Sequence, residues 1–229
     1  MRGITLLRLP SAARSAVSEP GLAGVIAMRL VGMLDSPYVR RSAITSTLLG
    51  LSVEHSSVSV FRHMDAFRAI NPLIKAPTLV CDDGTVITDS ALIVQHFEDE
   101  AGRSLRPTDP AARRRDLALT GIGVVAADKA VGIEYEEKRP ENHRYGPWQE
   151  RIGAQLVTAL DLLDAAAARG ELGAEPDLRP ADIMAAVAWG FCRFTIPHHV
   201  DEARWPALAS QARACEALDA FKAWPIDRE

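Results

Sequence analysis

The hydrophobic pattern of this 229-residue chain changes near residue 105. Up to about Phe97, short apolar runs typical of strands alternate with segments of helical periodicity, which predicts an α/β unit. Beyond the connector that follows, strand signals disappear, and segments rich in Ala and Leu repeat at helical spacing. We therefore expect an α/β domain over residues 28–104 and an all-helical domain over residues 105–229.

The first domain has the pattern of a strand and a helix followed by a hairpin. We expect strands over Arg29–Met33 and near residues 58–60, with a helix after the first strand that stops at Gly50. Two further short strands, Thr78–Cys81 and Thr85–Thr88, flank the sequence Asp-Asp-Gly, which is a hairpin turn signal.

Asp89 and Ser90 mark the start of the next helix, because both side chains can accept hydrogen bonds from exposed helical N–H groups. The buried side of this helix is expected to carry Leu92, Ile93, His96 and Phe97.

Two strongly periodic helices are expected in the second domain. One repeats apolar residues at helical spacing and closes at Gly170: Ile152, Leu156, Leu160 and Leu163. The other, Asp182–Phe194, is almost continuously apolar and is expected at the domain's centre. We expect three aromatic side chains in the core: Trp148, Trp189 and Phe194.

Residues 1–27 are rich in small residues and contain three arginines and one glutamate. We interpret them as an appended or disordered extension, although an acid-poor segment with Arg and Ser also resembles a mitochondrial transit peptide.

Composition excludes several classes of partner. The net charge of −4 provides no basic stripe for nucleic acid, and no apolar run approaches the roughly 20 residues that span a bilayer. The three cysteines are far apart in the sequence and form no C-x-x-C pair, which favours reduced thiols in a cytoplasmic protein.

Three separated motifs occur in order: "SPYVRR" after the first strand, "NPLIKAPTL" before the hairpin and "TDSALIV" after it. Together they resemble the glutathione S-transferase family, and the helical half, including "RPADIMAAVAWG", is similar as well. The resemblance implies an α/β thioredoxin-like N-terminal domain, an all-α helical-bundle C-terminal domain that supplies most of a second-substrate pocket, and a homodimer. It implies glutathione as co-substrate and no metal.

The catalytic candidate is Ser36. By the resemblance, its hydroxyl would donate a hydrogen bond to the glutathione sulfur and favour the thiolate, assisted by the positive end of the helix that begins at Pro37. Ser followed by Pro is also an ordinary helix cap, so a purely structural role stays open. Tyr38 is a rival hydroxyl, and the absence of a thiol at residue 36 disfavours glutaredoxin-like chemistry.

Glutathione-binding candidates follow from the other two motifs. Pro77 resembles the family's cis-proline, which exposes the backbone of Ala76 to the peptide. Lys75 resembles the lysine that approaches the glycine carboxylate, although the glycine that usually precedes it is Ile74 here.

Asp89 and Ser90 resemble the acidic-Ser pair that holds the γ-glutamyl end of glutathione. A helix N-terminus suits the ligand's carboxylate, and an anion nearby suits its ammonium group. Capping alone is the simpler reading of both residues, and capping is compatible with binding.

Two features of the helical half depart from simple expectations. Asp182 resembles the aspartate of a helix capping box, but the residue three positions earlier is Arg179, which cannot accept an amide hydrogen bond. His198 and His199 are adjacent and have no evident third ligand, so we expect surface or pocket-lining side chains rather than a metal site.

The predicted function is therefore that of a glutathione S-transferase that activates glutathione for attack on a small, apolar electrophile. The alternative is a non-catalytic protein on the same fold that binds glutathione or an apolar ligand. A third reading is a helical domain that recruits a partner protein. The sequence does not identify the electrophile, and metabolism, detoxification and stress roles are equally compatible.

Overall fold

The computed structural model describes residues 28–174 and 177–226, so the expected extension over residues 1–27 lies outside the described part. The chain divides into two compact units: the first ends at Gly102, and the second runs from Arg103 to Ile226. Within the described residues, no helix combines the length and the apolar character needed to cross a bilayer.

The first unit contains a mixed four-stranded sheet in the order β2-β1-β3-β4. Its strands are β1 (Met28–Val31), β2 (Val53–Ser56), β3 (Thr78–Val80) and β4 (Val86–Thr88). β1 pairs parallel with β2 and antiparallel with β3, and β3 pairs antiparallel with β4. The parallel pair is joined by a crossover through a helix, as a parallel connection requires.

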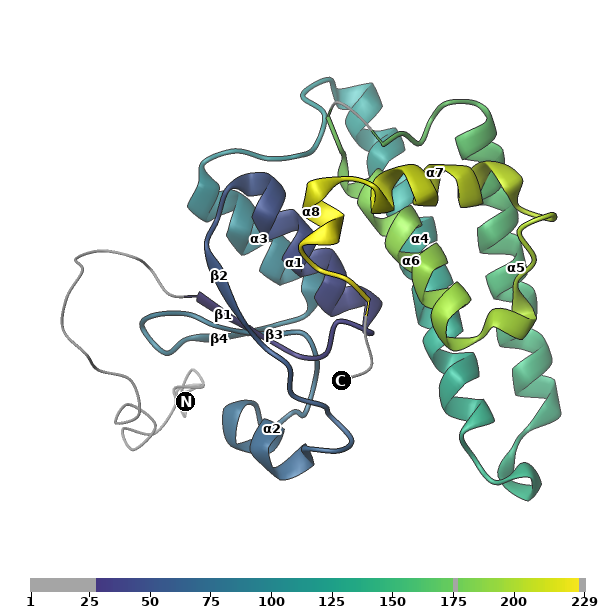
Figure 1. Ribbon diagram of the computed structural model, residues 1–229, viewed down its shortest axis with the longest axis horizontal. Helices are drawn as coiled ribbons and strands as arrows, with labels where there is room; N and C mark the ends of the chain where they lie inside the picture. Colours follow the sequence, from purple (N-terminus) through teal and green to yellow (C-terminus); the bar gives the residue numbers. More distant parts are fainter. Residues whose placement is uncertain (1–27, 175–176, 227–229) are drawn as a thin grey trace, which may run out of the picture. The chain divides into compact units, whose positions relative to one another are not determined.

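Three helices accompany the sheet: α1 (Pro37–Leu49), α2 (Met64–Ile70) and α3 (Ser90–Ala101). α1 and α3 pack together on one face, and α2 lies on the other (Figure 1). The side-chain alternation of the strands supplies both faces, since Phe67 of α2 packs against Val31 and Val80.

Most elements of this unit agree with the sequence predictions. Gly50 ends α1 in the left-handed conformation, with φ +77°, and the hairpin strands differ from their predicted bounds by one residue at an end. Together with the helical unit that follows, the sheet and its helices confirm the predicted fold class, a thioredoxin-like domain followed by a helical bundle.

The predicted strand near residues 58–60 is wrong. The strand lies at Val53–Ser56 instead, on the edge of the sheet, where its partly exposed side chains give it no strong apolar pattern. Val58 and Val60 are apolar because they pack against the small core cluster on the α2 face. The prediction for Leu92 is also wrong: this side chain is exposed, whereas Ile93 and Phe97 are buried.

The described residues of the second unit form helices joined by loops, with no strand among them. Its main helices are α4 (Pro110–Glu137), α5 (Gly146–Ala168), α6 (Pro180–Thr195), α7 (Pro206–Glu216) and α8 (Asp219–Lys222). α6 packs against α4 and α7 and is almost entirely buried, as its apolar sequence predicts. The four predicted core residues of α5 are also buried, but Trp148 at the start of that helix is exposed, contrary to prediction.

Arg179, at the N-cap of α6, has no side-chain oxygen to accept a hydrogen bond, and carboxylates of other residues accept hydrogen bonds at this helix start instead. Asp182 accepts a hydrogen bond from the backbone N–H of Arg179 at 2.9 Å and pairs with its guanidinium. Asp116, reaching from α4, accepts a hydrogen bond from the N–H of Ala181 at 3.1 Å. The orphan donors of this helix end are thus satisfied partly by a neighbouring helix.

Candidate functional site

Ser36 lies where β1 turns into α1. Its hydroxyl caps the helix by accepting a hydrogen bond from the N–H of Val39 at 3.4 Å, and Pro37 occupies the first helical position. The predicted capping role is therefore confirmed. A 3.4 Å contact is long for such a bond, and a hydroxyl that accepts can still donate its own proton. Capping and donation to a ligand are chemically compatible for this half-buried side chain.

Ala76 lies against the turn that carries Ser36. A Cβ atom built on Gly32 would come within 3.0 Å of the Ala76 Cβ and 2.6 Å of Val39 Cγ2, so only a glycine fits, and its φ of +139° has the same requirement. The Ala76–Pro77 peptide bond is cis, as predicted. The N-terminus of α1 and the segment that enters β3 are therefore in close contact.

Ile74 has a φ of +49°, a left-handed conformation that glycine adopts freely and that a β-branched residue seldom adopts. The backbone at this position thus keeps the conformation that the family's usual glycine would favour. The next residue, Lys75, is exposed, with its Nζ 5.9 Å from the centre of the Tyr38 ring on the first turn of α1. The lysine is therefore positioned over the same helix end as Ser36.

Asn71 ties this segment to the hairpin, and it is a residue that the sequence analysis missed. It is 1% exposed, and its amide nitrogen donates to the hydroxyls of Thr78 and Thr88, both at 2.8 Å. The Thr78 hydroxyl donates in turn to the carbonyl oxygen of Lys75 at 2.7 Å. The only sequence signal was an Asn-Pro pair, which ordinarily indicates a turn.

Asp89 follows β4 and caps α3. Its φ is +89°, and its Oδ1 accepts a hydrogen bond from the N–H of Ala91 at 2.8 Å, which confirms the predicted cap. Ser90, the first residue of the helix, is 5% exposed. Because Thr88 pairs with Thr78 across the sheet, this helix start adjoins the strand that begins after Pro77.

The structure therefore brings the six predicted residues onto three connected segments of one unit. The segments offer a hydroxyl at one helix start, a backbone edge beside a lysine, and a carboxylate with amide N–H groups at a second helix start. Such a set matches a small peptide that carries carboxylates, an ammonium group and a polar backbone.

The chain's own thiols are poor candidates for nucleophiles. Burial, assisted by the charges of Asp83, Asp82 and Glu100, raises the pKa of Cys81 to about 11. Burial also raises the pKa of Cys192 and of Cys215 to about 12. Their raised pKa values favour the protonated thiol, which is the less nucleophilic form, at neutral pH.

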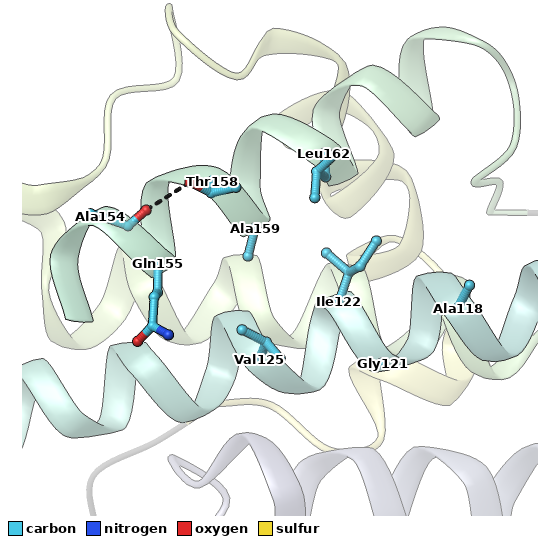
Figure 2. A pocket seen from close by; sticks show the side chains of 9 residues that line it. All are labelled: Ala118, Gly121, Ile122, Val125, Ala154, Gln155, Thr158, Ala159 and Leu162. Atoms are coloured by element: carbon cyan, nitrogen blue, oxygen red, sulfur yellow. Dashed lines mark hydrogen bonds between the residues drawn. The ribbon is translucent and has the colours of Figure 1, made fainter. Parts of the chain in front are cut away.

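An open apolar groove lies between α4 and α5 in the helical unit (Figure 2). It has a volume of about 660 Å³, and small residues are among those that line it. The lining residues are Ala118, Gly121, Ile122, Val125, Ala154, Gln155, Thr158, Ala159 and Leu162. Val125 and Leu162 are exposed, and so is Leu117 of α4. The packed pair of α4 and α5 therefore has an exposed apolar surface along this groove.

Comparisons with known proteins agree with this architecture. Residues 30–105 match the family model described as "Glutathione S-transferase, N-terminal domain", and all six predicted site residues fall within that match. An uncharacterized GST-like protein, YibF of Escherichia coli, is 26% identical over 168 residues, which cover 73% of this chain and 83% of that protein.

Solved structures extend the similarity over most of the chain. A glutathione S-transferase from Methylobacterium radiotolerans in complex with glutathione sulfonate has a TM-score of 0.79 at 25% identity, over 89% of this chain and 97% of that one. A glutathione transferase family member from Pseudomonas fluorescens with bound glutathione has a TM-score of 0.76 at 26% identity, over 88% and 100% of the two chains.

Proposed function

We propose that this protein is a glutathione transferase and that Ser36 stabilises the thiolate, because residues 30–105 match the model of the glutathione S-transferase N-terminal domain. The observation that supports this most directly is the contact of Ala76 with the Gly32 turn. That contact brings the serine's helix end beside the backbone on which the cysteinyl part of glutathione would lie.

In this proposal, the two ends of glutathione are held by charge. The γ-glutamyl carboxylate lies at the N-terminus of α3, where the N–H groups and the hydroxyl of Ser90 meet it, and its ammonium group pairs with Asp89. The glycine carboxylate pairs with Lys75. The cysteinyl backbone bonds to the backbone of Ala76, next to Pro77, as a short added strand.

The thiol then lies near Ser36. A hydroxyl that donates to sulfur binds the thiolate better than the thiol, and the positive end of the 13-residue helix α1 acts in the same direction. Together these effects lower the pKa of the bound thiol from about 8.5 towards neutrality. The thiol proton passes to solvent, and the thiolate sulfur attacks an electrophilic carbon to form a sulfur–carbon bond. The electron pair of the broken bond departs with the leaving group, or, in an addition, moves onto the neighbouring atom, which then takes up a proton.

The test is a calorimetric titration with glutathione, combined with the ultraviolet absorbance of the bound thiolate as pH is varied. Ser36→Ala removes both cap and donor. Ser36→Asp keeps a cap acceptor but cannot donate when ionised, and Tyr38→Phe removes the rival hydroxyl. We expect every variant to bind glutathione, with a lowered thiol pKa in the wild type and in Tyr38→Phe alone.

If Ser36→Ala leaves the thiol pKa unchanged, the alternative gains: a protein that binds glutathione or an apolar ligand without turnover. The confirmed capping role of Ser36 favours this alternative, because the cap alone accounts for a serine at that position. Failure of the wild type to bind glutathione would overturn the transferase proposal and the glutathione-binding form of the alternative, and would leave only a protein that binds an apolar ligand.

The remaining parts of the proposal concern assembly and location. A homodimer would cover the apolar groove between α4 and α5, where Val125 and Leu162 are exposed. The three free cysteines fit a reducing compartment, and we propose a cytoplasmic location. The electrophile is proposed to be small and apolar.

A further inference from the structure

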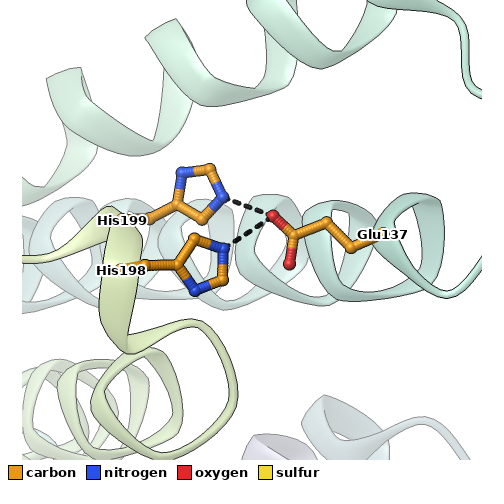
Figure 3. A group of neighbouring side chains, drawn as sticks. All are labelled: Glu137, His198 and His199. Carbon is orange, nitrogen blue, oxygen red and sulfur yellow. Dashed lines mark hydrogen bonds and ion pairs between the residues drawn. The ribbon is translucent and has the colours of Figure 1, made fainter. Parts of the chain in front are cut away.

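Three metal-ligating side chains meet at one end of the helical unit (Figure 3). Glu137 is the last residue of α4, and His198 and His199 belong to η3 (Pro197–His199), the short 3-10 turn that follows α6. The carboxylate and the histidines are 61 and 62 residues apart in sequence, so no local spacing reveals the group. Adjacent histidines lack the i, i+4 spacing of a helical metal site, and no third ligand was evident from the sequence, but Glu137 lies where a third ligand would be needed.

The two imidazoles point at the same oxygen. Nε2 of His198 lies 2.9 Å from Oε1 of Glu137, and Nε2 of His199 lies 2.6 Å from it. The two ring planes are tilted by 45°, with their centres 4.5 Å apart, and the three donor atoms all lie within 4.8 Å of one another. Adjacent histidines therefore converge here because the tight turn places both rings on the side that faces α4 (Figure 3).

The donor set fits a first-row transition ion. Zn²⁺ takes imidazole nitrogen at about 2.0–2.1 Å and carboxylate oxygen at about 2.0–2.2 Å, in a tetrahedron. Donors around such an ion are separated by about 3.3 Å, so each nitrogen–oxygen contact has to lengthen by less than about 1 Å. The side chains of His198, His199 and Glu137 are 61%, 37% and 29% exposed, respectively, which leaves room for that adjustment.

The supporting backbone is firm. Ile196, which precedes the turn, is fully buried, and its carbonyl oxygen accepts a hydrogen bond from the N–H of His199 at 3.0 Å. The carbonyl oxygen of Glu137 accepts a hydrogen bond from the guanidinium of Arg144. Local hydrogen bonds therefore hold the backbone on both sides of the cluster.

We propose that Glu137, His198 and His199 bind one divalent transition-metal ion, with Zn²⁺ as the best match and water completing its coordination. The ion would join the end of α4 to the turn after α6 and so stabilise the helical unit. This site does not depend on glutathione binding, and its test uses no glutathione.

The experiment titrates Zn²⁺ into the full chain by calorimetry and follows thermal unfolding in parallel. A Cys81→Ser background removes the one cysteine that is not buried. We compare His198→Ala, His199→Ala and Glu137→Gln with the matched control His143→Ala, an exposed histidine outside the cluster.

We expect one ion per chain, and a melting temperature that rises by about 5–10 °C when Zn²⁺ exceeds its dissociation constant a hundredfold. Each cluster variant should weaken binding at least about tenfold, because loss of a mere outer-shell partner already weakens metal binding 10–100-fold. The His143 variant should bind like its parent. Absence of stoichiometric binding, or equal binding by a variant that lacks both His198 and His199, would overturn the proposal.

Discussion

Replacing Asp182 with asparagine tests how the central helix of the helical unit begins. Asp182 is 2% exposed, and each of its oxygens accepts two hydrogen bonds. Oδ1 accepts from the N–H of Gly173 at 2.8 Å and from Nη2 of Arg179 at 2.9 Å. Oδ2 accepts from the backbone N–H and from Nε of Arg179, both at 2.9 Å.

Asparagine has nearly the same shape but carries one acceptor oxygen and one donor NH₂ group. In either orientation, the NH₂ group faces two donors, one of them a backbone N–H. Leaving a buried N–H without an acceptor lowers the free energy of unfolding by about 1–3 kcal/mol, and breaking a buried ion pair lowers it by about 3–5 kcal/mol. The Arg179 side chain is 31% exposed and regains some hydration, so we expect a loss near the lower end, about 3 kcal/mol.

The assay is urea unfolding followed by tryptophan fluorescence, because all four tryptophans lie in the unit from Arg103 to Ile226. A loss of this size corresponds to a melting temperature lower by roughly 6–12 °C. The matched control is Asp219→Asn, at a carboxylate that is fully exposed, and it should leave the transition unchanged. If Asp182→Asn unfolds at the same urea concentration as Asp219→Asn, the hydrogen-bond argument is wrong.

Two further predictions concern α4. Gly123→Ala should lower stability by about 1–3 kcal/mol, since a Cβ there would lie 2.8 Å from Met184 Cγ, whereas Gly153→Ala, with nothing within 4 Å, should raise it slightly in the same urea assay. Burial raises the pKa of Asp116, so the folded state binds a proton more tightly than the unfolded chain does. The contribution of Asp116 to the free energy of unfolding therefore falls as pH rises from about 3.8 through the raised pKa. Asp116→Asn should remove that pH-dependent decline while keeping an acceptor for Ala181; an unchanged difference between urea midpoints across this range would contradict the assignment.

Local patterns predicted the parts of the fold that depend on local chemistry. Gly50 ended its helix because glycine tolerates the left-handed conformation, and Ser36 and Asp89 capped theirs because their oxygens reach nearby N–H groups. The edge strand over Val53–Ser56 was missed because half-exposed residues need no apolar alternation. Leu92 was misplaced because an apolar residue on a helix is not always buried.

Contacts between distant segments were beyond the reach of sequence spacing. Glu137 and His198 meet only because α4 and α6 pack together, and Asp116 completes the start of α6 across the same packing. For the candidate glutathione site, the sequence indicated the residues that we propose as ligand contacts, but not Asn71, which donates hydrogen bonds to Thr78 and Thr88. Residues that act through other residues leave no motif, because any side chain with suitable hydrogen bonding and volume could serve.

The hydrogen bonds around Asn71 run in a fixed direction. The side-chain oxygen of Asn71 accepts a hydrogen bond from the N–H of Leu73, so its NH₂ group donates to both threonine hydroxyls. The Thr78 hydroxyl therefore donates its own hydrogen bond to the carbonyl oxygen of Lys75. Aspartate has the same outline but no proton to give, so the threonines would have to turn their protons inwards and leave that carbonyl without its donor. The loop under the lysine is thus specified by where protons point as much as by the shape of the side chain.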